Sequence, residues 1–156
     1  MPSILFVCTA NQCRSPMAEV LFRAHFGTEL RVQSAGIRAG PGGLPIDARA
    51  AAALHRHGCK LEKKWRSRRV EEADFEAFDL ILVMEAQHLQ DLLAVCPADS
   101  QPKLRLLLDF VPGFEGQDLP DPYFGPAQGF DQALALILRS VEGFSATWLA
   151  GAQRPR

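Results

Sequence analysis

The chain has 156 residues, of which 47% are hydrophobic and 22% are charged, and its formal net charge is −1. This composition predicts one globular domain with a substantial core, which we place at residues 1–150, with a C-terminal tail at 151–156. The near-neutral charge provides no general attraction to nucleic acid or to a membrane surface, and no apolar run is long enough to predict a transmembrane helix.

The four cysteines, at positions 8, 13, 59 and 96, show neither metal-site spacing nor the density of a disulfide scaffold. No metal site is therefore expected. The N-terminal apolar run is short and has no basic residues before it, so we do not expect it to be a signal peptide. Reduced thiols and the absence of these signals lead us to expect a cytoplasmic protein.

Strands and helices are predicted to alternate along the chain. A strand at 3–7 precedes a helix at 14–26 that Gly27 ends, a strand at 30–34 and an alanine-rich helix at 48–57 that Asp47 caps. A strand at 78–84, a helix from residue 85, a strand at 104–110 and a helix at 129–149 follow. This order predicts an α/β fold, a three-layer sandwich with a four-stranded parallel sheet.

Three segments between these elements allow more than one interpretation. The loop at 38–45, rich in Gly and Pro, is either a binding rim or an ordinary surface loop. His55 and His57, at a helix end, are expected to be solvated rather than catalytic. The basic run at 60–69 surrounds Trp65, but acidic residues follow at once, so we expect a solvated turn rather than a nucleic-acid site.

The most informative stretch is residues 8–16, Cys-Thr-Ala-Asn-Gln-Cys-Arg-Ser-Pro, between the first strand and the first helix. A helix N-terminus presents unpaired N–H groups and partial positive charge, so it binds anions. The same field favours the thiolate of Cys8, and Arg14 offers a planar fork that matches phosphate oxygens. A nucleophile and an anion site in one phosphate-binding loop predict phosphoryl transfer through a phosphocysteine. The alternative is a buried Cys8 in the core, with Arg14 pairing a surface acid.

A second stretch, residues 116–125, follows the last predicted strand. Prolines on both sides of Asp121 fix the backbone there, and the topology predicts that this loop lies at the same sheet edge as Cys8. A phosphocysteine mechanism needs an acid for the leaving oxygen and then a base for water, and one carboxyl group can serve as both. Asp118 is a competing carboxylate without a proline after it, and an ordinary surface turn is the alternative interpretation.

These two stretches resemble the catalytic motifs of the low-molecular-weight protein tyrosine phosphatases. The resemblance rests mainly on residues 8–16 and on Asp121-Pro122-Tyr123. The family pattern also fits Ser34-Ala35-Gly36, Pro45-Ile46-Asp47, Ser67-Arg68 and residues 78–84. The resemblance covers essentially the whole chain. It implies hydrolysis of protein phosphotyrosine and small aryl phosphates through a cysteinyl-phosphate, with no cofactor. It implies phosphotyrosine proteins as partners, a tyrosine kinase being one candidate, with no nucleic acid, no membrane insertion, and a monomer or weak dimer.

The resemblance also implies a role for each motif position. Cys8 is then the nucleophile, Arg14 binds the phosphate and stabilises the transition state, and Asp121 is the general acid and base. Asn11 supports the strained loop from a left-handed conformation, and Ser15 hydrogen-bonds the Cys8 sulfur. The phosphate-binding loop is completed by Thr9, Ala10, Gln12 and Cys13. The substrate rim is formed by Gly40, Tyr123 and Phe124.

The resemblance leaves Cys13 with two interpretations: a reversible disulfide with Cys8 under oxidation, or simple packing under the loop. The chain also departs from the family pattern. Ala10 stands where glycine is usual, which requires an ordinary backbone conformation there. Gln12 stands where tyrosine-directed members often carry a bulky aliphatic residue and protein arginine phosphatases a threonine. Gly40-Pro41-Gly42-Gly43 stands where eukaryotic members place a rim aromatic, which predicts weaker or different aromatic selectivity.

Three other functions compete with phosphotyrosine hydrolysis. A protein arginine phosphatase of the same fold is the nearest alternative because of Gln12. An arsenate reductase needs further cysteines for a disulfide relay, and the chain offers only Cys59 and Cys96, far apart in sequence. A catalytically silent redox or phosphoprotein-binding module is the third, although such a module needs neither the nucleophile nor the acid.

Overall fold

Four short apolar strands form a fully parallel sheet in the computed structural model, which describes residues 1–149 and 151. The strands β1 (Ser3–Cys8), β2 (Arg31–Gly36), β3 (Leu80–Val83) and β4 (Leu104–Leu106) lie in the order β2-β1-β3-β4. The predicted α/β fold with a four-stranded parallel sheet is confirmed. Apart from Gly151, the expected tail at 151–156 lies outside the described residues, and the domain boundary at 150 stays a prediction.

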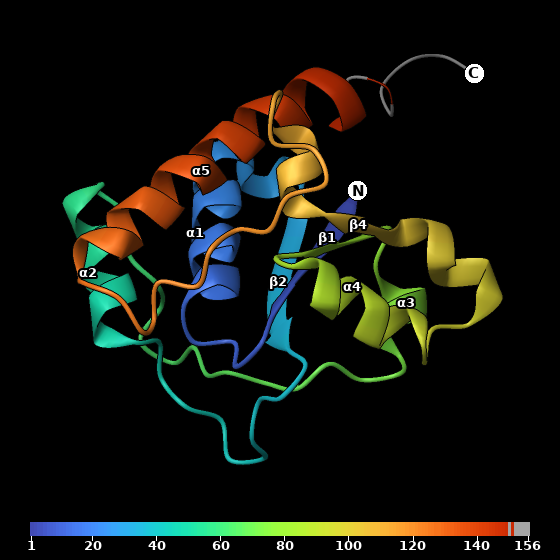
Figure 1. The fold of residues 1–156 in the computed structure, drawn as a ribbon, viewed down its shortest axis with the longest axis horizontal. Coiled ribbons are helices and arrows are strands. Elements are labelled where there is room, and N and C mark those ends of the chain that lie inside the picture. Colours follow the sequence, from blue (N-terminus) through green and yellow to red (C-terminus); the bar gives the residue numbers. More distant parts are fainter. Residues whose placement is uncertain (150, 152–156) are drawn as a thin grey trace.

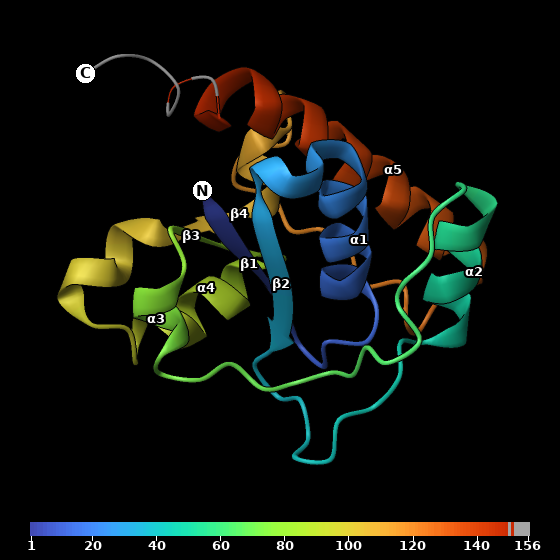
Figure 2. The same ribbon diagram turned by 180° about the vertical axis from the view of Figure 1, so that it is seen from behind.

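Helices cover both faces of the sheet and make three layers (Figure 1, and from behind Figure 2). One face carries α1 (Arg14–Phe26), α2 (Ala48–Arg56) and α5 (Gln128–Phe144), and the other carries α3 (Asp74–Ala77) and α4 (Ala86–Leu93). Short 3₁₀ helices add η1 (Gly27–Glu29), η2 (Ala98–Lys103) and η3 (Leu107–Phe110). The sequence did not predict α3, η1 or η2, which are too short to show a helical period.

The direction of the Cys8 side chain follows from strand alternation. Successive side chains of a strand point to opposite faces of the sheet. In β1, Ile4 and Phe6 belong with Cys8 to the core under α1 and α5, whereas Leu5 and Val7 belong to the core under α3 and α4. Cys8 therefore ends the strand with its side chain on the face of the sheet covered by α1.

β1 also holds the position in the sheet where ligands bind in this class of fold. It lies between β2 and β3. The connection from β1 runs through α1 to β2 on one side, whereas the connection from β3 runs through α4 to β4 on the other, so a crevice opens at the carboxyl ends of β1 and β3. The loop from β1 to α1 lies at this edge (Figure 1). Topology alone thus places the phosphate-binding loop where a ligand has access.

The fourth strand is shorter than predicted. Residues 104–110 were expected to be one strand, but β4 ends at Leu106 and η3 follows. Leu107 and Phe110 are both buried, and a continuous apolar run does not distinguish a buried strand from a buried helical turn. The turn packs on α5 at Gly143, where a Cβ atom would overlap the carbonyl oxygen of Phe110.

The last helix is also shorter than predicted. α5 ends at Phe144, and a π-helical turn, η4 (Ser145–Leu149), completes the expected span. None of the helices in the described part of the chain is long and apolar enough to span a membrane.

The basic run at 60–69 is largely exposed to solvent, as predicted, and only its end at Ser67 and Arg68 is anchored to the fold. Ser67 and Asp74 are buried, and Arg68 donates to both carboxylate oxygens of Asp74, at 2.9 and 3.0 Å. Asp74, the first residue of α3, therefore anchors the end of the run. His55 and His57 are exposed, as predicted.

Candidate active site

The phosphate-binding loop is shaped by Asn11. Its φ is 58°, the only positive φ of a non-glycine residue in the described chain, and its side chain is fully buried. Asparagine tolerates this left-handed conformation better than most residues. Ala10 has no positive φ, so the alanine at a usual glycine position causes no backbone strain.

Three hydrogen bonds fix the Asn11 side chain. Its Oδ1 accepts from the backbone N–H of Arg68 at 2.9 Å, and its Nδ2 donates to the hydroxyls of Ser15 at 2.8 Å and Ser34 at 3.0 Å. A backbone N–H can only donate, so the amide orientation is unambiguous. Ser15 therefore accepts a hydrogen bond from Asn11 and keeps its own hydroxyl proton to donate.

The Ser15 hydroxyl lies beside the Cys8 sulfur, the predicted nucleophile. Its Oγ is 2.9 Å from the Cys8 sulfur and 3.4 Å from the carbonyl oxygen of Ala35. The shorter contact is the stronger hydrogen bond, so the sulfur is the main acceptor for the Ser15 proton. Such a donor stabilises a thiolate, which is the reactive form of cysteine.

A buried network supports the loop from below. Ser34 donates to a carboxylate oxygen of Glu19 at 2.6 Å, and the indole N–H of Trp65 donates to the same oxygen at 3.2 Å. Arg23 pairs with the other oxygen at 2.7 Å. Glu19 is only 4% exposed, so its charge is compensated by these donors, as a buried carboxylate requires.

Arg14 is buried, although the two acids that it faces, Glu85 and Asp121, are partly exposed. It is 1% exposed, and its Nη1 donates to Glu85 and to the carbonyl oxygen of Leu119, each at 2.6 Å. Its Nη2 is 3.5 Å from a carboxylate oxygen of Asp121. The guanidinium is thus held rigidly from one side, and Nη2 faces the second catalytic candidate.

The Asp121 loop is preformed. The carboxylate accepts from the backbone N–H of Tyr123 at 3.1 Å, and the guanidinium of Arg49 donates to the Tyr123 carbonyl at 3.0 Å while lying over its ring. Asp118, the competing carboxylate, accepts from the N–H of Ala86 at 2.8 Å. The structure therefore places Asp118 at the start of α4 rather than at Arg14.

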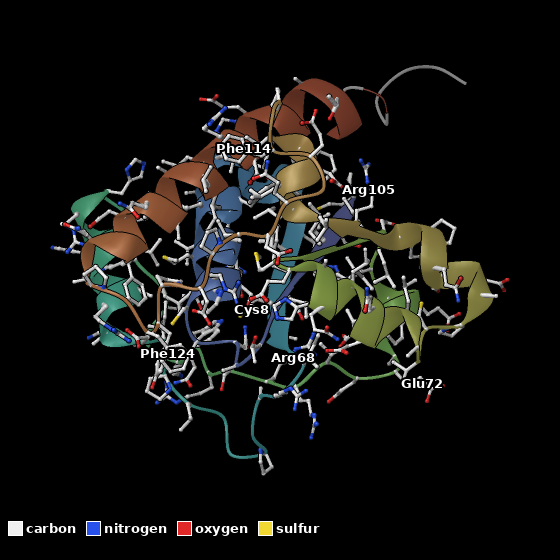
Figure 3. The ribbon with its side chains drawn as sticks, in the orientation of Figure 1. Cys8, Arg68, Glu72, Arg105, Phe114 and Phe124 are labelled. Atoms are coloured by element: carbon white, nitrogen blue, oxygen red, sulfur yellow. The ribbon has the colours of Figure 1, made fainter. Side chains whose placement is uncertain are left out.

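These groups surround one cavity of about 240 Å³. Its lining consists of Cys8, Thr9, Ala10, Gln12, Cys13, Arg14, Asp121, Tyr123 and Phe124. The structure thus brings together the two sequence motifs, and Cys8 and Phe124 lie at the same end of the molecule in Figure 3. Gly40, predicted for the rim, is not part of the lining.

Two residues of the site were missed by the sequence reasoning, Glu85 and His88. Both follow β3, whose carboxyl end lies at the edge that carries Cys8, and this topology was the only signal available for them. His88 is 4% exposed, its Nε2 is 2.9 Å from the Thr9 hydroxyl and 4.0 Å from the Glu85 carboxylate. Its Nδ1 has no hydrogen-bond partner within the described residues.

Burial keeps His88 neutral. It lowers the pKa of His88 below the ordinary value, and the charge of nearby Glu85 opposes this shift only in part. A neutral ring leaves one nitrogen unprotonated, and an unprotonated Nδ1 costs less to bury than an unpaired N–H. In that tautomer the Nε2–H donates to Thr9, at the start of the phosphate-binding loop.

Cys13 and Gln12 complete the loop. Burial, aided by the charge of Asp47, raises the pKa of Cys13 to about 12, so Cys13 stays a thiol at neutral pH. The side chain of Gln12 donates to the carbonyl of Pro45 at 3.3 Å. No group of three or more His, Cys, Asp or Glu side chains in the described chain is arranged to hold a metal ion.

The chemistry of this cavity is that of a phosphatase with a cysteine nucleophile, because a stabilised sulfur, a fixed guanidinium and a carboxylate open onto the same space. Sequence comparison agrees. Residues 3–153 match the family described as "Low molecular weight phosphotyrosine protein phosphatase", and the chain belongs to this family of cysteine-dependent hydrolases.

Individual relatives span the whole length. The chain is 36% identical over 151 residues to a low molecular weight protein-tyrosine-phosphatase of Streptomyces coelicolor, covering 92% of this chain and 91% of that protein. The crystal structure of a low molecular weight phosphotyrosine phosphatase from Vibrio cholerae is 32% identical, with a TM-score of 0.87 over 97% of this chain and 99% of the other. The YwlE arginine phosphatase from Geobacillus stearothermophilus is 26% identical, with a TM-score of 0.87 over 100% and 99%.

Proposed function

We propose that this protein hydrolyses phosphotyrosine in proteins, and small aryl phosphates, in two steps through a cysteinyl-phosphate. The observation that carries the proposal is the single cavity in which the Cys8 sulfur, 2.9 Å from the Ser15 hydroxyl, lies together with Arg14 and Asp121. Nucleophile, phosphate ligand and proton donor are the groups that phosphoryl transfer requires.

In the first step the Cys8 sulfur attacks phosphorus. Arg14 and the N-terminus of α1 stabilise the charge on the equatorial oxygens, and protonated Asp121 gives its proton to the leaving phenolate oxygen. In the second step Asp121, now a carboxylate, takes a proton from water as the water attacks phosphorus. The thiolate of Cys8 leaves, stabilised by the Ser15 hydroxyl, and phosphate is released.

The aromatic edge of the cavity supports a phenyl phosphate as substrate. Tyr123 and Phe124 are in edge-to-face contact with ring centroids 4.8 Å apart, and they are 50% and 89% exposed. Exposed aromatic rings beside a cavity are suited to pack on a planar ring. We propose phosphotyrosine proteins as the substrates, with a tyrosine kinase as one candidate. We further propose that the protein acts in the cytoplasm as a monomer or weak dimer.

A second candidate, phosphoarginine hydrolysis, is favoured by the similarity to an arginine phosphatase and by Gln12 in the cavity lining. The amide of Gln12 can hydrogen-bond a guanidinium group as well as a phenolic oxygen. The same nucleophile, guanidinium and acid serve both reactions, so only the group next to the phosphate distinguishes them.

The test compares phosphate release from a phosphotyrosine peptide and a phosphoarginine peptide, in EDTA, with Cys8→Ser as the blank. We expect faster release from phosphotyrosine, abolished in Cys8→Ser. Faster release from phosphoarginine would move the assignment to the second candidate, and Gln12→Thr would then be the next variant. No release from either peptide would refute the enzymatic proposal and leave a redox or phosphoprotein-binding module.

Similar rates on phosphotyrosine and on aliphatic phosphomonoesters would support weak aromatic selectivity, as Gly40-Pro41-Gly42-Gly43 predicts. A large preference for phosphotyrosine would contradict it and assign the selectivity to Tyr123 and Phe124.

A further inference from the structure

Two segments distant in sequence run together beside the phosphate-binding loop, residues 38–45 and residues 66–69. Ser67 and Leu44 join them through two hydrogen bonds: the Ser67 N–H donates to the Leu44 carbonyl at 2.8 Å, and the Leu44 N–H donates to the Ser67 hydroxyl at 2.9 Å. Gly43 packs against the second segment as well, because a Cβ atom there would lie 3.1 Å from Cβ of Arg66.

Both segments are also attached to the phosphate-binding loop itself. The N–H of Arg38 donates to the carbonyl of Thr9 at 2.8 Å, and the N–H of Arg68 donates to the side chain of Asn11 at 2.9 Å. The two segments therefore form a fixed edge of the site, and Figure 3 shows Arg68 next to Cys8 at this end of the molecule.

Three arginines of this edge, Arg38, Arg66 and Arg69, form what we term the basic ledge. All three are exposed, and within the described chain none lies within 4.0 Å of a carboxylate oxygen. In the described chain the side chains of Arg66 and Arg69 donate only to carbonyl oxygens. Arg66 donates to Trp65 at 2.7 Å and to Lys63 at 3.2 Å, and Arg69 donates to Ile37 at 3.2 Å. Their positive charge is therefore not neutralised.

The acids nearest the site do not compensate the ledge either. Asp47 pairs with Arg49, and Glu85 pairs with Arg14. Asp74 pairs with Arg68, and Glu72 lies away from Cys8 (Figure 3). Glu71, Glu72 and Asp91 line one cavity together with Arg69, but none of them forms an ion pair with it in the described chain. An anionic partner approaching the cavity over residues 38–45 thus meets arginines that form no ion pair within the protein.

We infer that the basic ledge binds acidic side chains that flank the phosphorylated residue of a protein substrate. The inference rests on the proposed phosphatase function and adds a sequence preference to it. Arginine forks bind carboxylates in two-point geometry, and each exposed pair contributes little, so three arginines act together on association and on KM. The ledge lies beside the cavity and leaves the chemical step to Cys8, Arg14 and Asp121.

The experiment measures kcat/KM for matched phosphotyrosine peptides, with aspartates or alanines on the N-terminal side, the C-terminal side or both. Each enzyme is also assayed on a small aryl phosphate, and peptide rates are divided by that rate so that damage to the active site cancels. The variants are Arg38→Glu, Arg66→Glu and Arg69→Glu, singly and together, with Arg→Gln versions that remove the charge without reversing it. Arg105→Glu, at the opposite end of the molecule (Figure 3), is the matched control.

For the wild type we expect the acidic peptide to be preferred about tenfold at low salt, mainly through a lower KM. The preference should fall as salt is raised, because exposed charges are screened over about 8 Å at physiological ionic strength. The triple glutamine variant should lose the preference and the triple glutamate variant should reverse it, whereas Arg105→Glu should retain it.

A wild type that turns over acidic and neutral peptides equally would overturn the inference, and so would a triple variant that keeps the preference. Failure of the proposed function is distinguishable, because it removes aryl phosphate hydrolysis as well. In that event the same phosphotyrosine peptides, now labelled with a fluorophore, test the ledge directly. Their binding is measured to Cys8→Ser with and without the triple substitution. Equal affinity for acidic and neutral peptides would then refute it.

Discussion

At the residue scale, the orientation of one buried amide determines the hydrogen bonding of the nucleophile. The Arg68 N–H fixes the Oδ1 of Asn11, the Nδ2 then donates to Ser15, and Ser15 is left to donate to the Cys8 sulfur. The first two steps follow because a backbone N–H and an amide NH₂ can only donate. The third rests on the shorter contact of Ser15, 2.9 Å to the Cys8 sulfur against 3.4 Å to the Ala35 carbonyl. Replacing Asn11 should therefore affect the sulfur through Ser15, without a direct contact.

Replacing Asp121 by alanine should reduce turnover about 10²- to 10⁴-fold for phosphotyrosine and alkyl phosphates, the usual contribution of a general acid. The loss should be smaller for aryl phosphates with activated leaving groups, which leave without a proton. Steady-state rates across a series of leaving groups provide the measurement. Asp118→Ala is the matched control, since this carboxylate contacts Ala86; equal losses for all leaving groups in Asp121→Ala would remove Asp121 from the acid role.

His88 makes the stability of the fold depend on pH. Its pKa is lowered in the folded protein by burial, with Glu85, Arg14, Asp91 and Asp118 as the charged groups around it. The unfolded chain then binds a proton more readily than the folded one, so stability is full above the ordinary histidine pKa of about 6.5 and is lost as the pH falls below it.

The measurement is the free energy of unfolding in urea at pH 8 and pH 5, for the wild type and for His88→Asn. Asparagine keeps a hydrogen-bonding group towards Thr9 but does not titrate, so the variant should lose less stability than the wild type over this range. Equal losses would show that other groups cause the pH dependence.

At the element scale, β2 and the phosphate-binding loop fit only because position 36 is glycine. A Cβ atom there would lie 2.7 to 2.9 Å from backbone atoms of Thr9, Ala10 and Asn11. Backbone atoms of a loop fixed by Asn11 cannot move aside cheaply. The end of one strand therefore dictates the path of the loop that follows its neighbour.

Gly36→Ala should accordingly lower kcat at least tenfold and destabilise the protein by about 1 to 3 kcal/mol, the usual cost of overpacking. Urea unfolding and steady-state kinetics on an aryl phosphate measure the two effects. Gly42→Ala is the matched control, because nothing lies within 4 Å of the corresponding Cβ atom. A fully active Gly36→Ala enzyme would show that the loop can relax.

At the scale of the whole molecule, the site is assembled from the two ends of the chain. Arg14 lies at the start of α1, yet it donates to the carbonyl of Leu119, 105 positions later, and pairs with Glu85 after β3. Leu119 is held in turn by a backbone hydrogen bond to Met84. An anion that binds Arg14 therefore links segments that separate on unfolding.

Inorganic phosphate should stabilise the entire fold for this reason. A ligand that binds only the folded state adds about 2.7 kcal/mol when present at a hundred times its Kd. We expect the melting temperature to rise with phosphate concentration in the wild type and in Arg105→Ala, but not in Arg14→Ala. A similar rise in Arg14→Ala would place the anion elsewhere.

The sequence by itself determined the architecture and the two catalytic motifs. Continuous apolar strands alternating with helical periods permit few arrangements other than a parallel sheet with helices on both faces. Cys8 and Arg14 are six positions apart in one loop, so their proximity in space could be predicted from the sequence. The prolines on both sides of Asp121 indicated the second motif. Local patterns of this kind are visible wherever the relevant neighbours are close in sequence.

Only the tertiary structure decided what depends on distant neighbours. It showed that residues 107–110 form a helical turn against α5, which a run of buried leucines does not specify. It brought Glu85 and His88 to the site, and it attached Arg68, at the end of the exposed basic run, to Asn11 of the phosphate-binding loop. In each case the deciding contact joins residues far apart in sequence, and such a contact becomes visible only when the sheet order and the packing of the layers are known.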